Sequence, residues 1–161
     1  MAILSQRRCV PSFRIDPAMA AVEKSVLIEH SAVQMYELVD RVEDYPKFLP
    51  WCGGTELIER TDKRTSATIR IAYHGIHSAF STINEKDIPH WMNIRLRDGP
   101  FKSMEGGWRF TPLGETACKV EFRLHYEFSS RLLEKALGPV FSRIVGTLVE
   151  SFVRRAEEVY G

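Results

Sequence analysis

Hydrophobic and polar residues alternate with a period of two along much of this chain. The run from residue 118 to 128 is the clearest, because every second residue is apolar and the residues between them are charged or His. Successive side chains of a strand point to opposite faces, so this run predicts a strand with one dry and one solvated face. Similar segments, separated by short turns, predict further strands. The predicted strands lie at about residues 22–28, 55–60, 65–73, 77–85, 91–97, 101–111 and 118–128.

Two other segments have the spacing of a helix instead. Ser31 and Gln34 match a capping box at a helix start, and the apolar residues that follow fall on one helical face. Apolar residues recur with the same spacing from Arg131 to about Tyr160, which predicts one long C-terminal helix capped by Ser129 or Ser130. Gly138-Pro139 should bend this helix or mark its true start.

The segment from Asp44 to Cys52 fits neither pattern. It holds Tyr45, Phe48, Leu49 and Trp51 together with two prolines. Two prolines so close together are incompatible with a strand or a long helix. A proline disfavours helical geometry in the residue before it, so we expect extended backbone at Tyr45 and Leu49. The segment is therefore predicted to be a rigid apolar corner that connects the first helix to the second strand.

The order of these elements predicts an α+β fold. A strand, one or two short helices, six strands and a final helix are expected when a curved antiparallel sheet of about seven strands wraps one helix. The 161 residues suffice for one domain, which we place at residues 19–161. Residues 1–18 carry Arg7, Arg8 and Arg14 between prolines and are expected to be a disordered extension or the product of an alternative start.

Composition narrows the classes of function. The net charge is +1 with 44% hydrophobic and 27% charged residues, so the basic excess of a general nucleic-acid coat is missing and we expect no DNA partner. Cys9, Cys52 and Cys118 are odd in number and far apart, which favours free thiols in a reducing compartment. No unbroken apolar run reaches 18 residues, so we expect any membrane contact to be peripheral.

The corner resembles a known family signature, Tyr-Pro-x-Phe-Leu-Pro-Trp-Cys, of the coenzyme Q-binding and ribosome association toxin A proteins. These proteins are a branch of the START-like (SRPBCC) lipid-binding superfamily. Residues 45–52 match the signature at every defined position. The resemblance covers about residues 22–160, is specific only at the corner, and implies the helix-grip fold.

The resemblance implies a hydrophobic cavity between the sheet and the long helix, holding ubiquinone or a similar isoprenoid quinone. We therefore expect a non-catalytic carrier or chaperone that supports respiration and requires no cofactor. It is expected in the cytoplasm or peripheral to the inner membrane, or in mitochondria if the source is eukaryotic. The residues expected to contact the ligand are Tyr45, Pro46, Phe48, Leu49, Trp51, Ile71, Met92, Met104, Trp108, Phe110, Leu137, Phe141, Ile144 and Leu148.

Three alternatives stay open beside this prediction. Side chains, rather than a ligand, can fill the space under the helix, since protein interiors are densely packed. The same family includes proteins that block association of ribosomal subunits, and Arg143, Arg154 and Arg155 are candidates for such a contact. A cyclase would need inward-facing acid and base groups, for which Glu105, Arg95, Arg109 and Tyr73 are the candidates.

The sequence predicts neither a metal site nor a catalytic nucleophile. His74 and His77 are the nearest approach to a metal motif, but a turn at Gly75 would point the two rings apart. Cys52 has no fixed histidine close by in the sequence, which favours an inert, small apolar residue. Exposed aromatic rings at the corner, with Lys47 beside them, are expected to rest on a membrane surface.

Overall fold

Seven strands form one antiparallel sheet in the computed structural model, which describes residues 19–161 of the chain. The expectation for residues 1–18 lies outside the described residues. The order across the sheet is β1-β7-β6-β5-β4-β3-β2, so the first and last strands are neighbours. The strands are β1 (Ala20–Ile28), β2 (Cys52–Arg60), β3 (Arg64–Tyr73), β4 (Ile76–Asp87), β5 (Trp91–Asp98), β6 (Phe101–Pro112) and β7 (Cys118–Phe128).

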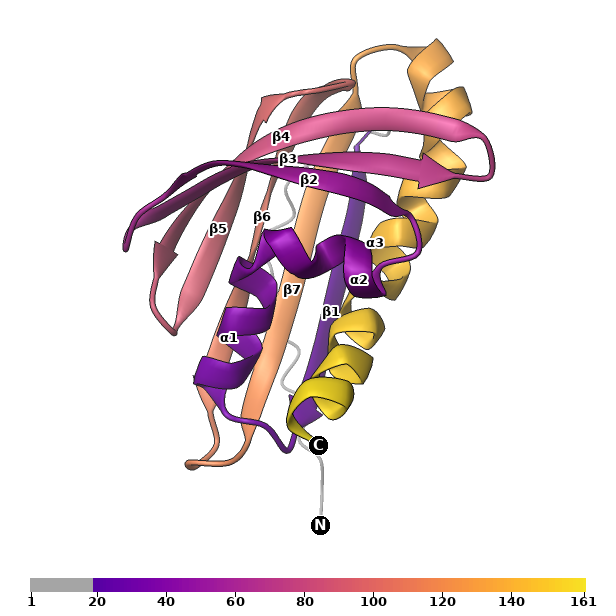
Figure 1. Cartoon of the computed structure of the whole chain (residues 1–161). Helices are drawn as coiled ribbons and strands as arrows, with labels where there is room; N and C mark the ends of the chain where they lie inside the picture. The colour runs from indigo at the N-terminus through magenta and orange to yellow at the C-terminus, as the bar shows by residue number, and fades with distance from the viewer. Residues whose placement is uncertain (1–18) are drawn as a thin grey trace, which may run out of the picture.

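The sheet is strongly curved around a single long helix, α3 (Arg131–Tyr160). Figure 1 shows α3 lying along β1 and β7, while β2, β3 and β4 arch across the same side of the molecule. Bulges accompany this curvature, for example between Cys52 and Gly54 on β2 and between Leu96 and Asp98 on β5. The predicted α+β, helix-grip architecture is confirmed.

Three short elements follow β1 and cover one end of the sheet: α1 (Ala32–Asp40), the 3₁₀ turn η1 (Val42–Asp44) and α2 (Tyr45–Phe48) (Figure 1). The capping box at α1 is present, since the Gln34 amide donates to Ser31 Oγ at 3.1 Å and the Ser31 amide donates to Gln34 Oε1 at 3.0 Å. The predicted apolar face of α1 is buried against β6, β7 and α3.

The long helix begins at Ser130, whose hydroxyl accepts from the amide of Leu133. Pro139 lies inside α3. The prediction that Gly138-Pro139 marks the start of the helix is therefore wrong. By length and composition α3 is apolar enough to cross a membrane, a test that the core helix of a folded domain also passes. Here α3 packs on β1 and β7, and 33% of the residues in its most apolar stretch are buried.

The alternation predicted for β7 holds in detail. On β7, Cys118, Val120, Phe122, Leu124 and Tyr126 are all buried. The inner face of β1 contains Lys24 among apolar neighbours, and its ammonium lies 3.9 Å from the Glu150 carboxylate on α3. Both side chains of this pair are more than 40% exposed, so the Lys24 ammonium stays in contact with solvent.

Candidate functional site

The signature corner is buried rather than displayed. Tyr45, Leu49 and Trp51 are 8%, 1% and 7% exposed, and the Phe48 ring is half-buried beneath the Arg155 guanidinium, 5.2 Å from its centroid. The prediction that exposed rings of the corner rest on a membrane surface is therefore wrong. Burial is favourable for Tyr45 and Phe48 because their rings pack against Phe152 of α3, a partner that the sequence did not predict. Lys47 is exposed and forms an ion pair with Asp44 at 3.0 Å.

The backbone of the corner corrects one prediction and confirms another. Leu49 is extended, with φ −104° and ψ 105°, as expected for a residue before proline. Tyr45 is helical, with φ −54° and ψ −42°, so the extended geometry predicted for it is wrong. Pro46 occupies the first turn of α2, where a missing N–H costs nothing. The buried Tyr45 hydroxyl donates to the carbonyl of Val39, which fixes the ring in this geometry.

Aromatic side chains from the corner, the sheet and α3 meet at Phe152. Its ring lies 5.5 Å from Tyr45, 5.3 Å from Phe48 and 5.4 Å from Trp108, each in an edge-on arrangement. Trp108 continues the contact to Phe122 at 4.5 Å. We call Tyr45, Phe48, Trp108, Phe122 and Phe152 the corner cluster. It joins three of the predicted ligand contacts to one aromatic residue of α3 that was not among them.

A second group of rings surrounds Phe141, in the first half of α3. Phe101 and Tyr126 lie 4.9 and 4.7 Å from it, and Phe80 lies 5.8 Å away. Thus aromatic side chains occupy much of the space between the sheet and α3. Of the predicted contacts, Ile71, Met92, Met104, Phe110 and Ile144 are also buried in this core, Leu137 and Leu148 are half-buried, and Pro46 is exposed.

Charged and polar groups interrupt the core beneath α1. The Lys86 ammonium, on a side chain that is 2% exposed, lies 3.2 Å from both carboxylate oxygens of Asp40 at the end of α1. Thr65 donates to the same carboxylate at 2.8 Å. Tyr36 lies one helical turn before Asp40, and Asn84 lies two residues before Lys86 on β4. We call Tyr36, Asp40, Thr65, Asn84 and Lys86 the α1 polar cluster.

Two atoms of this cluster lack any hydrogen-bond partner among residues 19–161. They are Tyr36 Oη and Asn84 Oδ1, and both are buried. Burial raises the pKa of the Tyr36 hydroxyl well above its ordinary value, and the nearby Asp40 raises it further, so the hydroxyl stays protonated. Sequence analysis missed the cluster, although the period of two along β4 places Asn84 and Lys86 on the inner face.

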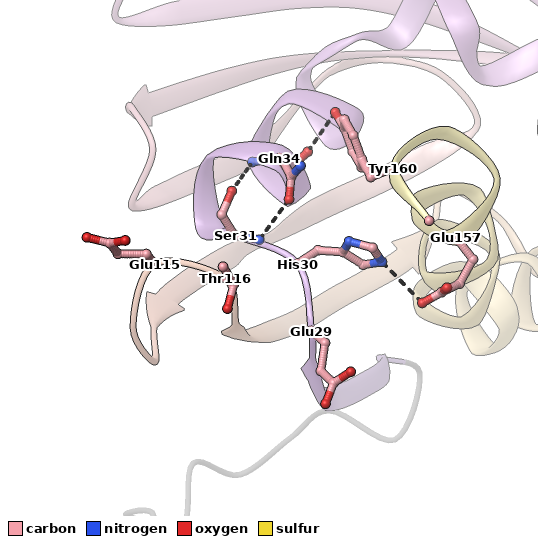
Figure 2. Close-up of a pocket in the computed structure, with 9 residues that line it drawn as sticks. Glu29, His30, Ser31, Gln34, Glu115, Thr116, Glu157 and Tyr160 are labelled. Carbon is pink, nitrogen blue, oxygen red and sulfur yellow. Dashed lines mark hydrogen bonds and ion pairs between the residues drawn. The ribbon is translucent and has the colours of Figure 1, made fainter.

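A shallow cleft of about 530 Å³ lies where β1, α1 and the end of α3 meet (Figure 2). The His30 ring bonds Glu157 at 3.1 Å, and the Tyr160 hydroxyl donates to the carbonyl of Gln34 at 3.3 Å. In Figure 2, Glu29 and Glu115 point away from His30. These contacts attach the end of α3 to α1, and none of the predicted ligand contacts lines the cleft.

The charged groups considered for a cyclase lie outside the core. Arg95, Glu105 and Arg109 are exposed, and Arg95 pairs with Glu85 of the neighbouring strand at 3.2 Å. Tyr73 is half-buried at the end of β3. Residues 19–161 contain no group of three or more His, Cys, Asp or Glu side chains that could hold a metal ion. Burial raises the pKa of the Cys52 thiol, which agrees with the interpretation of an unreactive residue.

Comparison with known proteins places this geometry in a family. The family described as "Polyketide cyclase / dehydrase and lipid transport" matches residues 28–153. The chain belongs to this family. A START superfamily protein from Mycobacterium smegmatis shares the fold, with a TM-score of 0.69 at 20% identity over 86% of this chain and 98% of that one.

Two curated relatives carry names that bear on function. "Ribosome association toxin RatA" of Vibrio cholerae serotype O1 is 43% identical over 143 residues, which are 89% of this chain and 99% of the relative. "Coenzyme Q-binding protein COQ10 homolog B, mitochondrial" of Xenopus laevis is 26% identical over 86% of this chain and 58% of its own length. The resemblance inferred from the corner signature is therefore confirmed.

Proposed function

We propose that this protein binds a polyprenyl quinone between the sheet and α3, and that it carries or positions this lipid for the respiratory chain without transforming it. The observation that supports the proposal most is the unequal covering of α3. All of its buried residues lie from Phe141 onward, and none lies between Arg131 and Val140. Leu133, Leu137 and Val140 are half-buried at its first half, where an apolar ligand can extend the core.

The free energy of burial suits a ligand with an isoprenoid tail. Each buried methylene contributes about 0.8 kcal/mol, so a five-carbon unit contributes roughly 3 to 4 kcal/mol when fully enclosed. The aromatic groups around Phe141 and Phe152 fill much of the interface, so ligand entry requires α3 to separate from the sheet. Leu137 and Leu148 are half-buried, so separation exposes less of their apolar surface than it does for the fully buried residues of α3.

Binding rather than catalysis is favoured by where the acidic and basic groups lie. The charged side chains of β5 and β6 considered for a cyclase are on the solvated face. The inner-face pair, Lys86 and Asp40, neutralises its own charges at 3.2 Å. Both charged groups are thereby held in an ion pair, which disfavours proton transfer to or from a substrate.

The proposal is tested by mass spectrometry of an organic extract from protein purified out of a quinone-producing host. We expect a quinone in the wild-type extract and none in a Phe48→Ala/Leu148→Arg double variant. Leu132→Arg is the matched control, because Leu132 is 77% exposed and lies outside the core. Circular dichroism must show that all three proteins are folded. A wild-type extract free of quinone contradicts the proposal.

Ribosome association is a second candidate, favoured by the name of the relative that is 43% identical. Of the three arginines considered for this contact, Arg143 and Arg154 are exposed, whereas Arg155 bonds Glu158 and covers Phe48. Sedimentation with ribosomal subunits in a sucrose gradient tests the candidate. If it holds, Arg143→Glu/Arg154→Glu weakens co-sedimentation and the Phe48→Ala/Leu148→Arg variant does not, provided that both are folded.

A further inference from the structure

The α1 polar cluster is an anomaly in an otherwise apolar layer. Buried hydroxyl and amide groups almost always have a hydrogen-bond partner, and an unpartnered one calls for a specific explanation. Tyr36 is 2% exposed, yet its hydroxyl has no partner among the described residues. The side-chain oxygen of Asn84 is in the same situation, while its amide nitrogen contacts only the sulfur of Met92, at 3.6 Å.

A closed ring of neighbouring residues joins Asn84 to Tyr36. Asn84 faces the same side of the sheet as its cross-strand neighbour Thr65, which donates to Asp40, and Asp40 lies one turn after Tyr36. On the other side, the Asn84 amide contacts Met92, and Met92 lies opposite Trp108 of β6. The Tyr36 side chain completes this ring of residues by packing edge-on against Phe110 at 5.6 Å.

The ring is continuous with the aromatic interface under α3. Met92 pairs with Trp108 across β5 and β6, and the Trp108 ring stacks on Phe110 at 6.2 Å. Trp108 also contacts Phe152 of α3. The aromatic interface under α3 and the α1 polar cluster are therefore joined by one line of packed side chains, which a ligand spanning both would have to displace.

We propose that the α1 polar cluster is the subsite for the oxygen atoms of the ligand, with the Tyr36 hydroxyl donating a hydrogen bond to a ring carbonyl. This inference rests on the proposed function, and it names the end of the pocket at which the quinone head group binds. The isoprenoid tail then extends toward the corner cluster and α3.

The chemistry of the cluster suits a carbonyl acceptor. The neutral Tyr36 hydroxyl is a donor, and the Asn84 amide can present its NH2 group after a half-turn that leaves its volume unchanged. The Lys86 ammonium uses two of its three N–H bonds on Asp40, which leaves one for a further acceptor. Because the charge of Lys86 is balanced by Asp40, the subsite favours a polar neutral group over an anion.

The test compares two probes with the same tail, one with oxygen atoms on its ring and one without. The first is ubiquinone with two isoprenoid units, and the second is geranylbenzene, which keeps a six-membered ring and the same tail. Isothermal titration calorimetry gives the affinity of each probe for the wild-type chain. We expect the quinone to bind about tenfold more tightly, the ratio that corresponds to one net hydrogen bond.

Tyr36→Phe should abolish this preference by weakening the quinone about tenfold, with geranylbenzene unchanged. Asn84→Leu should weaken the quinone in the same direction. Tyr160→Phe is the matched control, because its hydroxyl already donates to Gln34, and it should keep the wild-type ratio. Tyr36→Phe should be no less stable to heat than the wild type, since it removes an unpartnered group.

The outcomes separate the inference from the function on which it rests. A Tyr36→Phe chain that binds both probes with the wild-type ratio overturns the inference and leaves the proposed function standing. A wild-type chain that binds neither probe overturns both. A wild-type chain that binds the two equally also overturns the inference, because the oxygens then contribute nothing.

Discussion

The buried ion pair between Asp40 and Lys86 gives the sharpest prediction about stability. Asp40→Asn keeps the shape of the side chain and removes its charge, which leaves the Lys86 ammonium in a site where its side chain is 2% exposed. Breaking a buried pair in this way costs about 3 to 5 kcal/mol, because the remaining charge is not solvated. That is a large part of the roughly 5 to 15 kcal/mol by which a domain is stable.

Removing Lys86 instead of Asp40 should lower the unfolding free energy by less, because Asp40 has other partners. In Lys86→Met, Thr65 still donates to Asp40 at 2.8 Å and Arg60 Nε still lies 3.4 Å away, while the carboxylate is 13% exposed. We expect a loss of about 1 to 2 kcal/mol. The double variant Asp40→Asn/Lys86→Met removes both charges, and it should be within about 2 kcal/mol of the wild type.

Urea unfolding at pH 7, followed by the fluorescence of the buried tryptophans, measures these differences. Glu56→Gln is the matched control, since its pair with Arg70 is 3.8 Å long and both side chains are more than half exposed. It should change the unfolding free energy by less than about 0.5 kcal/mol. An Asp40→Asn loss below about 1 kcal/mol would refute the reasoning, because Lys86 would then have to be solvated.

Three further predictions concern packing, capping and pH. Phe152→Ala should lower the unfolding free energy by about 3 to 5 kcal/mol, because it leaves a cavity at the centre of the corner cluster. Urea unfolding measures this loss, and a loss under about 1 kcal/mol would contradict the prediction. Ser31→Ala should lower the unfolding free energy by about 1 kcal/mol in the same assay, because it removes the N-cap of α1. Ser103→Ala is the control, since Ser103 lies within β6 and caps no helix, and it should not show this loss. Lys47 and Arg41 hold the pKa of Asp44 below its usual value. Their ion pairs with Asp44 therefore stabilise the fold fully at a pH above the usual pKa of an aspartate. This stabilisation is lost as the pH falls through the lowered pKa. Unfolding free energy measured from pH 6 down to pH 2 should therefore fall less steeply in Asp44→Asn than in the wild type, and equal slopes would show that the pairing is absent.

The order and faces of the elements were predictable because each follows from a local pattern. The alternation along β7 and the Ser31 capping box both predicted what the structure contains. Tyr45 shows where a local rule fails. The proline after it favours extended backbone, but helical geometry places the ring against Phe152 and the hydroxyl on Val39, and that burial outweighs the local preference.

The candidate site was less predictable, because a period of two identifies an inner face without saying what fills it. Met92 and Trp108 were correctly expected inside, yet the contact of Trp108 with Phe152 on α3 depends on how far the sheet curves. Lys86 was overlooked because a lysine is rarely buried, and only the distant Asp40 makes its burial tolerable. A contact between residues 46 positions apart leaves no periodic signal.

Quinone binding by the folded chain is tested most directly by extraction of a quinone from a membrane. Liposomes containing ubiquinone are incubated with the folded chain and removed by centrifugation, and the quinone that remains with the protein is measured by its absorbance. We expect up to one quinone per chain for the wild type and for Leu132→Arg, and a large loss for Phe48→Ala/Leu148→Arg. A folded wild-type chain that leaves all of the quinone in the liposomes would contradict this expectation.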